Sequence, residues 1–308
     1  MKTPIAFIIF RRPEETARVW ERIREAQPEK LFLIADGGIN EEEWVKCHAA
    51  RKVVETIDWE CEVHRNFSDT NLGCRDRVVS GLDWVFEHVE EAIILEDDCL
   101  PSFSFFRFCE ELLIKYDKDT RIAQVSGTNY QDGHVRGSAS YYFSKYPTIW
   151  GWATWKRAWV NRDCSAQTWN NPEIQNLILG KCASDTEEFK MGFRFNAAHT
   201  QSIDTWDYGW IFSVWCQNGM ACVPETNLVQ NIGFGPDATH TRAEEKIMSF
   251  LNSEMEFPLR HPQIFIANHQ ADEYYFKKYF GGTEAYKPFF IKSIKSLKKL
   301  FKRILFNN

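Results

Sequence analysis

Short apolar runs alternate along the first 127 residues with longer stretches in which apolar positions recur every three or four residues. The apolar runs predict strands at residues 5–10, 31–35, 60–65, 92–95 and 122–126. The longer stretches predict helices at residues 16–26, 41–57, 75–88 and 103–116. Strands that alternate with helices are typical of βαβ units. We therefore predict an α/β fold with a mainly parallel sheet flanked by helices.

The periodic pattern weakens after residue 127. Residues 128–204 are rich in Trp, Tyr, Asn and Gly, a composition typical of a substrate-binding region. Two late strands are predicted at 221–224 and 228–232. Neither an internal repeat nor a low-complexity linker interrupts the chain, which predicts one compact unit followed by a tail.

The tail, residues 287–308, carries seven basic residues and no acidic ones. Its apolar residues fall at helical spacing: Phe290, Ile294, Leu297, Phe301 and Ile304. Such a pattern predicts a C-terminal basic amphipathic helix that can lie on an anionic membrane surface. The alternative is a helix docked on the protein with a solvated basic side.

Composition is that of an ordinary soluble protein: 44% of the 308 residues are hydrophobic, 26% are charged, and the net charge is −6. The chain shows no signal-peptide pattern and no apolar stretch of about 18 residues. Nine cysteines without a Cys-x-x-Cys pair favour reduced thiols. We expect a cytoplasmic protein, possibly peripheral on the cytoplasmic face of the inner membrane. Nucleic-acid binding fits poorly, because the excess of positive charge is confined to the tail.

An acidic triplet, Glu96-Asp97-Asp98, ends the predicted strand at 92–95. Unpaired charges are costly to bury, so three carboxylates at this position need a physical reason. A hard divalent cation is bound through one or two carboxylates together with the phosphates of a substrate. Open α/β sheets bind ligands beyond the carboxyl ends of their strands. The triplet therefore indicates a nucleotide-diphosphate site, and the alternative is an acidic loop after a core strand.

Arg12 and Asp36 follow the first two predicted strands and are expected at the same edge of the sheet. An arginine beside a helix N-terminus is well suited to bind phosphate. A carboxylate at the next strand end can accept a hydrogen bond from a base or a ribose. The alternatives are a surface salt bridge for Arg12 and an Asp-Gly turn for Asp36.

Asp207 lies between Trp206 and Tyr208, aromatic neighbours that restrict water and raise the pKa of a carboxyl group toward that of a useful base. The alternative is a solvated acid at a helix start. Asp204 is a competing candidate for the base. His240 is a candidate contact for phosphate or metal, and its alternative is a packed, hydrogen-bonded histidine.

Three tryptophans, Trp150, Trp152 and Trp155, occur in a run with small residues between them. They can form a flat platform that a ligand approaches. Core packing explains them equally well, because tryptophan is highly buried on average.

Taken together, these residues resemble the nucleotide-diphospho-sugar transferases of the GT-A fold. The resemblance is to a bacterial group related to the inverting N-acetylglucosaminyltransferases of N-glycan branching and O-mannose extension. It covers residues 4–242. The matching segments, in family order, are Phe10-Arg11-Arg12-Pro13-Glu14-Glu15-Thr16, Ile34-Ala35-Asp36-Gly37, Asn71-Leu72-Gly73-Cys74, Leu95-Glu96-Asp97-Asp98-Cys99-Leu100-Pro101, Trp206-Asp207, and Gly233-Phe234-Gly235 with Ala238-Thr239-His240.

The resemblance implies a role for each matching residue on the donor side. Arg12 would contact the donor diphosphate and Asp36 the nucleobase. Glu96 and Asp97 would face the ribose and the donor sugar, and Asp98 would bind Mn²⁺ or Mg²⁺. Arg77 and His240 are assigned to donor binding as well. The family usually has Asn-Arg-Pro after its first strand, so the Arg11-Arg12-Pro13 of this chain leaves open which arginine meets the diphosphate.

For the reaction, the resemblance implies Asp207 as the general base of an inverting transfer from a UDP-sugar, possibly UDP-GlcNAc. The acceptor would be a hydroxyl of a cell-surface glycan or glycolipid. Residues 1–286 would form the transferase domain, with 1–127 as the nucleotide-sugar half and 128–286 as the acceptor half. The alternatives are a non-catalytic sugar-binding protein and a sugar-nucleotide pyrophosphorylase. A pyrophosphorylase normally has a Gly-rich loop after strand one, which this sequence lacks.

Overall fold

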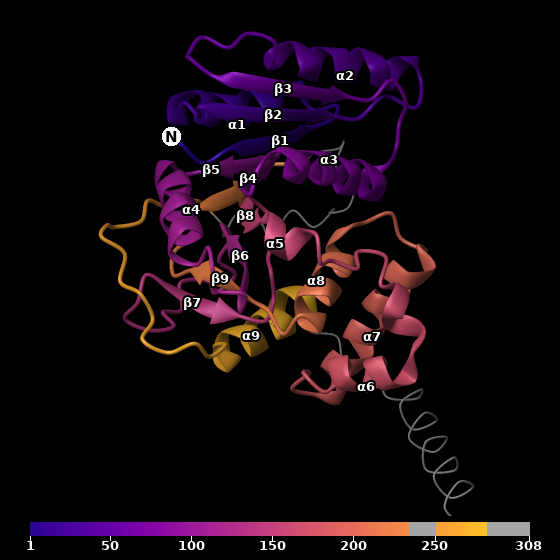
Figure 1. Ribbon diagram of the computed structural model, residues 1–308, viewed down its shortest axis with the longest axis vertical. Helices are drawn as coiled ribbons and strands as arrows, with labels where there is room; N and C mark the ends of the chain where they lie inside the picture. Colours follow the sequence, from indigo (N-terminus) through magenta and orange to yellow (C-terminus); the bar gives the residue numbers. More distant parts are fainter. Residues whose placement is uncertain (234–250, 282–308) are drawn as a thin grey trace, which may run out of the picture.

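The computed structural model describes residues 1–233 and 251–281, and it is built around one eight-stranded sheet (Figure 1). The strand order is β3-β2-β1-β4-β8-β6-β9-β7. These strands are β1 Ile5–Ile9, β2 Lys30–Ala35, β3 Glu62–Phe67, β4 Glu91–Glu96, β6 Ile122–Ser126, β7 Tyr141–Ser144, β8 Trp152–Trp155 and β9 Met220–Pro224. A small antiparallel sheet pairs β5 (Cys99–Pro101) with β10 (Val229–Asn231).

Helices cover both faces of the large sheet. They are α1 Pro13–Ala26, α2 Glu41–Val53, α3 Cys74–His88, α4 Phe103–Lys115, α5 Lys156–Trp159, α6 Pro172–Leu179, α7 Asp185–Thr200, α8 Asp207–Cys216 and α9 His269–Tyr275. A 3-10 turn, η1 (Gln167–Asn170), precedes α6, and a π-helical segment, η3 (Phe276–Phe280), continues α9. Figure 1 shows α6 and α7 set apart from the sheet, beyond α8.

Strands β3, β2, β1 and β4 are parallel and follow the order of one half of a doubly wound sheet. β8 then inserts antiparallel between β4 and β6, and β9 runs parallel to β6. The predicted α/β class, with a mainly parallel sheet flanked by helices, is confirmed.

Two apolar clusters form the core, one on each face of the sheet. α1 and α4 pack on one face through residues such as Trp20 and Phe105. α3, α5 and α8 pack on the other through residues such as Leu82, Trp159 and Trp210. β1 is buried at every position because helices cover both of its faces, which explains why its sequence is a continuous apolar run.

The structure corrects several local predictions. The helix predicted at 41–57 ends at Val53. β5, β7, β8 and helices α5 to α9 were not predicted. Of the three tryptophans considered as a ligand platform, Trp152 and Trp155 are packed in the core instead. Trp150 is half-buried.

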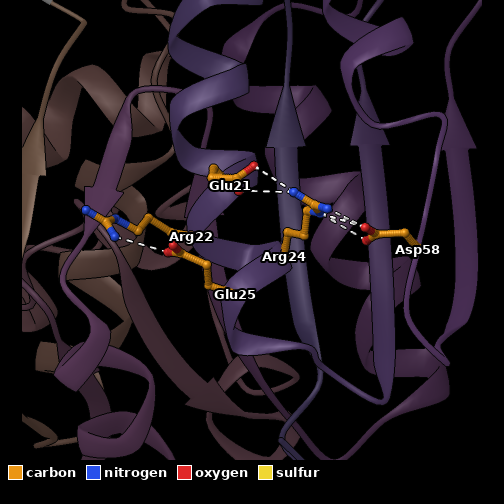
Figure 2. Close-up of polar contacts among 5 residues, drawn as sticks. All are labelled: Glu21, Arg22, Arg24, Glu25 and Asp58. Carbon is orange, nitrogen blue, oxygen red and sulfur yellow. Dashed lines mark hydrogen bonds and ion pairs between the residues drawn. The ribbon is translucent and has the colours of Figure 1, made fainter.

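The exposed face of α1 carries a group of ion pairs (Figure 2). Arg24 Nε donates to both carboxylate oxygens of Asp58, at 3.0 and 2.9 Å, and Arg24 Nη1 donates to Glu21 at 3.1 Å. Arg22 pairs with Glu25 at 3.0 Å. Asp58 lies between α2 and β3, so Arg24 connects α1 to that loop.

All nine cysteines lie in the described residues, and none forms a disulfide. Four of the thiols are buried and Cys216 is exposed. Among the described helices, none combines the length and the apolar character needed to cross a bilayer. The predicted tail helix at 287–308 falls outside the described residues, so its contact with a membrane stays a prediction.

Candidate functional site

Five of the predicted site residues, Arg12, Asp36 and the acidic triplet, lie at the carboxyl ends of strands that meet at one edge of the sheet. Ile9 of β1 is in register with Ala35 of β2, and Ile8 is in register with Glu96 of β4. A cleft of about 640 Å³ opens at this edge. Seven of the eight predicted site residues line it: Arg12, Asp36, Arg77, Glu96, Asp97, Asp98 and Asp207. The eighth, His240, falls outside the described residues.

Arg12 binds the acidic triplet directly. Its Nη1 donates to Asp98 Oδ2 at 2.6 Å and to Asp97 Oδ1 at 3.3 Å. The other oxygen of Asp97 accepts the backbone N–H of Phe10 at 2.9 Å. Asp97 is buried and therefore joins the ends of β1 and β4, while Asp98 is half-buried and faces the cleft.

Negative charge exceeds positive charge at this point of the cleft. The carboxylate of Glu96 makes no hydrogen bond or ion pair with any residue in the described ranges. Burial, and then the charges of Asp98 and Asp97, raise the pKa of Glu96; Arg12 opposes the rise. Burial and Asp98 raise the pKa of Asp97 in the same way. The charge of Asp207 also raises the pKa of Glu96, so these carboxylates outnumber the guanidinium of Arg12 at this point.

The carboxylate of Asp36 accepts hydrogen bonds from backbone amides. Its Oδ1 accepts the N–H of Gly37 at 2.9 Å and of Leu72 at 3.0 Å, and its Oδ2 accepts the N–H of Gly73 at 3.1 Å. This buried carboxylate holds the loop at 71–73 against the end of β2. The geometry matches the turn-forming alternative for Asp36, and its predicted contact with a nucleobase stays a prediction.

The structure separates the two candidate bases. Both oxygens of Asp204 accept backbone N–H groups at the start of α3, from Cys74 at 2.9 Å and from Arg75 at 3.0 Å. Asp204 therefore caps α3 from a distant part of the chain. Gly73 has a left-handed φ of 82°, and a Cβ there would lie 2.8 Å from Asp204 Oδ2. Only glycine leaves room for this cap.

Asp207 begins α8 and is half-buried. Its Oδ1 accepts a hydrogen bond from Thr205 Oγ1. Burial raises the pKa of Asp207, although Thr205 and nearby backbone N–H groups oppose the rise. A raised pKa makes a carboxylate a better proton acceptor. Asp207 is thus half-buried rather than fully solvated at its helix start, and its role as the base stays a prediction.

Two further arginines line the cleft. Arg77 is buried; its Nη2 donates to the backbone and side-chain oxygens of Asn66, at 2.5 and 3.0 Å. Its Nε is buried and has no hydrogen-bond partner among the described residues. Arg11 pairs with Glu43 of α2. Arg12 is thus the arginine that reaches the acidic triplet.

The donor set fits a hard divalent cation bound together with phosphates. In residues 1–233 and 251–281, no three His, Cys, Asp or Glu side chains are arranged to hold a metal by themselves. Mg²⁺ commonly needs only one or two carboxylates when phosphates complete its shell. Gly233 leaves the space beside Asp98 open, because a Cβ at this position would lie 2.3 Å from Asp98 Oδ2.

Aromatic side chains also line the cleft, and several of them were missed in the sequence. Four that come from separate segments are Tyr130, Trp150, Tyr275 and Phe280, here called the aromatic wall. Only Trp150 was singled out as a candidate platform. The aromatic density at residues 274–280 is the signal that could have identified the others.

No protein-family model matches the chain, and no curated protein matches its sequence. Among solved structures, galactosyltransferase LgtC in complex with donor and acceptor sugar analogues is 12% identical over 88% of this chain and 94% of its own, with a TM-score of 0.38. UDP-glucose pyrophosphorylase complexed with UDP-glucose is 7% identical over 73% and 90%, with a TM-score of 0.35. The 4-diphosphocytidyl-2C-methyl-D-erythritol synthase of Anaerococcus prevotii is 8% identical over 81% and 96%, with a TM-score of 0.37. At this level of similarity, the function has to be argued from the cleft itself.

Proposed function

We propose that the chain is a glycosyltransferase that moves a sugar from a nucleotide-diphosphate donor to a hydroxyl group. One observation carries the proposal. A single cleft holds an arginine within an acidic triplet at the strand ends and, separately, a half-buried carboxylate, Asp207, that is not committed to capping a helix. The first group suits a diphosphate leaving group, and the second suits an incoming hydroxyl.

On the donor side, Arg12 would bind the diphosphate and offset the charge that develops on it as the sugar departs. Asp98, with Glu96 beside it, would hold Mn²⁺ or Mg²⁺ together with the phosphates. Bound there, the cation supplies Lewis-acid stabilisation of the leaving diphosphate. Asp97 would keep Arg12 and the end of β1 in place, and Asp36 would shape the nucleobase seat by holding residues 71–73.

On the acceptor side, Asp207 would accept the proton of the attacking hydroxyl. The hydroxyl oxygen forms a bond to the anomeric carbon while the bond from that carbon to the diphosphate oxygen breaks. The nucleoside diphosphate leaves with the electron pair of that bond. A single displacement with one base and no enzymatic nucleophile inverts the anomeric centre, through an oxocarbenium-like state.

A thermal-shift screen of sugar nucleotides, with and without Mn²⁺ or Mg²⁺, is the first test. A ligand that binds only the native state raises the melting temperature by mass action, so the true donor is identified by its shift. We expect a UDP-sugar to give the largest shift, and the cation to increase it.

Analysis of the products by NMR then tests the reaction. We expect release of nucleoside diphosphate and a product whose anomeric configuration is opposite to that of the donor. Retention of configuration would exclude the single displacement. Conversion of the sugar nucleotide and pyrophosphate into a nucleoside triphosphate would instead identify a pyrophosphorylase.

A further inference from the structure

Arg194 of α7 lies one layer behind the surface of the cleft. Its guanidinium is 4.1 Å from the centre of the Phe280 ring and 5.5 Å from that of the Tyr208 ring. Both rings line the cleft, whereas Arg194 does not. The two rings belong to separate segments, η3 and the first turn of α8, and Arg194 reaches them from a third. Arg194 therefore connects the aromatic wall to the helix that begins at Asp207.

Hydrogen bonds hold the guanidinium of Arg194 but leave its charge unpaired. Nη2 donates to the backbone oxygen of Phe280 at 2.6 Å, and Nη1 donates to that of Lys190 at 3.3 Å. The Nε atom is buried and has no hydrogen-bond partner in residues 1–233 and 251–281, and no carboxylate of those residues forms an ion pair with Arg194. A half-buried charge that meets only carbonyl oxygens and rings is costly, so it needs a physical reason.

The charge of Arg194 acts on the start of α8. Asp207 and Tyr208 are the first two residues of this helix. Burial raises the pKa of Asp207; the hydrogen bond from Thr205, backbone N–H groups and the charge of Arg194 oppose the rise. At Tyr208, burial and then the charge of Asp207 raise the pKa of the hydroxyl, and Arg194 opposes that rise as well. The guanidinium against the Tyr208 ring is thus within electrostatic reach of Asp207.

Four other titratable groups interact with the charge of Asp207, and none of these four carries a positive charge. They are Cys74 of α3, Glu96 of β4, Tyr208 of α8 and Tyr275 of α9. The charge of Asp207 disfavours ionisation of all four, and each ionised form would in turn disfavour the carboxylate of Asp207. Among these neighbours and Arg194, only the arginine favours the ionised carboxylate.

We propose that Arg194 is a positioning residue of this site: its charge keeps Asp207 ionised, and its contacts tie Phe280 to the start of α8. A carboxylate must be ionised to accept a proton from an attacking hydroxyl. Burial alone would extend the pH range in which Asp207 is protonated, and the charge of Arg194 narrows that range. The guanidinium itself stays protonated, because arginine does not lose its proton in proteins. The inference rests on the proposed function, since it concerns the base of the same cleft.

The direct test is an NMR titration of the full chain labelled with carboxyl-¹³C aspartate, in which glutamates such as Glu96 give no signal. The signal of Asp207 is the one that is lost in Asp207→Asn. We expect this signal to titrate at higher pH in Arg194→Gln than in the wild type. It should keep its wild-type midpoint in Arg194→Lys, which retains the charge. An unchanged midpoint in Arg194→Gln would overturn the proposal.

Turnover at saturating donor tests the consequence for the reaction. The rate should fall on the acid side of the pH profile as Asp207 takes up a proton, and this limb should move to higher pH in Arg194→Gln. We expect kcat to fall about threefold to tenfold on the acid side and to recover at higher pH. A merely structural role would instead reduce kcat by one factor at every pH, and that result would overturn the proposal.

Arg162→Gln is the matched control. Arg162 is likewise a half-buried arginine against an aromatic ring, 4.4 Å from the centre of Trp159, but it pairs with Asp83 and does not line the cleft. Its removal should leave the titration of Asp207 unchanged. Arg194→Met removes the charge of Arg194 but keeps an unbranched chain against the two rings, so it supplies the same comparison where Arg194→Gln unfolds the protein.

The two measurements separate the role of Arg194 from the proposed function. A shifted titration of Asp207 in Arg194→Gln, together with wild-type turnover in Asp207→Asn, would support the electrostatic contact and exclude Asp207 as the base. Loss of turnover in Asp207→Asn, together with an unchanged titration in Arg194→Gln, would support the base and overturn the role of Arg194.

Discussion

The exposed face of α1 and the edge of the cleft carry the same kinds of side chain in opposite settings. On α1, Arg22 and Arg24 pair with Glu21, Glu25 and Asp58 in contact with solvent (Figure 2). In the cleft, Arg12 pairs with Asp97 and Asp98, Glu96 and Asp207 lie nearby, and none of these five residues is exposed.

The difference shows which charges carry information about function. Water and salt screen the pairs on α1, and such pairs contribute little to stability. The cleft holds unbalanced charge where screening is weak, which costs free energy in the absence of a ligand. Such an arrangement is expected where a cation and a substrate complete the site.

The largest expected effect is on catalysis. Asp207→Asn removes the proposed base with little change in shape, and turnover should fall roughly 10²–10⁴-fold, the usual contribution of general-base catalysis. Asp204→Asn is the comparison variant: Asp204 caps α3 and only helps to position Asp207, so it should mainly lower the melting temperature and reduce the rate far less than Asp207→Asn does. Single-turnover rates together with melting curves separate the two effects. A wild-type rate for Asp207→Asn would refute the assignment of the base.

Removal of the arginine that pairs with the acidic triplet tests the charge imbalance directly. Arg12→Ala leaves two partly buried carboxylates without their partner, and we expect a loss of about 3 kcal/mol in the free energy of unfolding. Urea unfolding without added metal measures the loss. Added Mg²⁺ should restore part of it. A loss in the free energy of unfolding as small as that of an exposed ion pair would contradict the idea that the cleft charges are poorly screened.

The pH dependence of stability should reveal the raised pKa values. Native Glu96 and Asp97 retain protons that the unfolded chain loses above about pH 4. Because the native state then binds more protons, the free energy of unfolding should fall as the pH rises from about 5 to 8. Asp58, which pairs with Arg24 of α1, has a lowered pKa; its stabilising contribution is complete above the ordinary carboxyl range and does not change in this window.

Asp272 also makes the free energy of unfolding fall as the pH rises, because burial raises its pKa to about 6. Urea unfolding at several pH values, for the wild type and for Glu96→Gln, isolates the part that belongs to the cleft. Equal slopes in the two proteins would show that the cleft carboxylates do not titrate in this window.

Glu96→Gln should also stabilise the resting protein. It removes one of the four like charges, and no described residue pairs with Glu96, so we expect a gain of about 1 kcal/mol at pH 8 without metal. Transfer activity should fall in the same variant, because the carboxylate is proposed to serve the metal and the donor. A loss of stability would mean that Glu96 has a favourable role in the fold.

The smallest effect is expected on α1. Arg24→Ala removes the contacts with Glu21 and Asp58 shown in Figure 2, and the melting temperature and the turnover should both stay within experimental error. If Arg24→Ala destabilised the protein as much as Arg12→Ala does, the exposed pairs and the cleft charges would not differ in their contribution to stability.

The first half of the fold was predictable because its sequence is periodic. β1, β2 and β4 are apolar runs that end in polar residues, and parallel strands bring those ends to one edge. The same logic placed Arg12, Asp36 and the acidic triplet at one edge, whereas Asp207 and Arg77 were named on other grounds. β7 and β8 were missed because each has only four residues, all buried, and shows no alternation. In α7, exposed Phe189 and Phe193 obscure the apolar stripe.

The rest of the site depends on contacts between distant parts of the chain. Asp204 caps a helix that begins 130 positions earlier, so the local sequence could not distinguish it from Asp207 as the base. The three backbone amides that bind Asp36 come partly from residues 72 and 73, and the local sequence did not indicate these contacts. The aromatic wall combines residues about 150 positions apart, and only the tertiary structure brings them together.

The cap made by Asp204 has an energetic consequence. Asp36 fixes the loop at 71–73, this loop leads into the amides that Asp204 binds, and Asp207 follows three residues later. The candidate base is thus located by backbone contacts that exist before any acceptor arrives. Folding itself places Asp207, so little further reorganisation of the protein is needed when the hydroxyl enters the cleft.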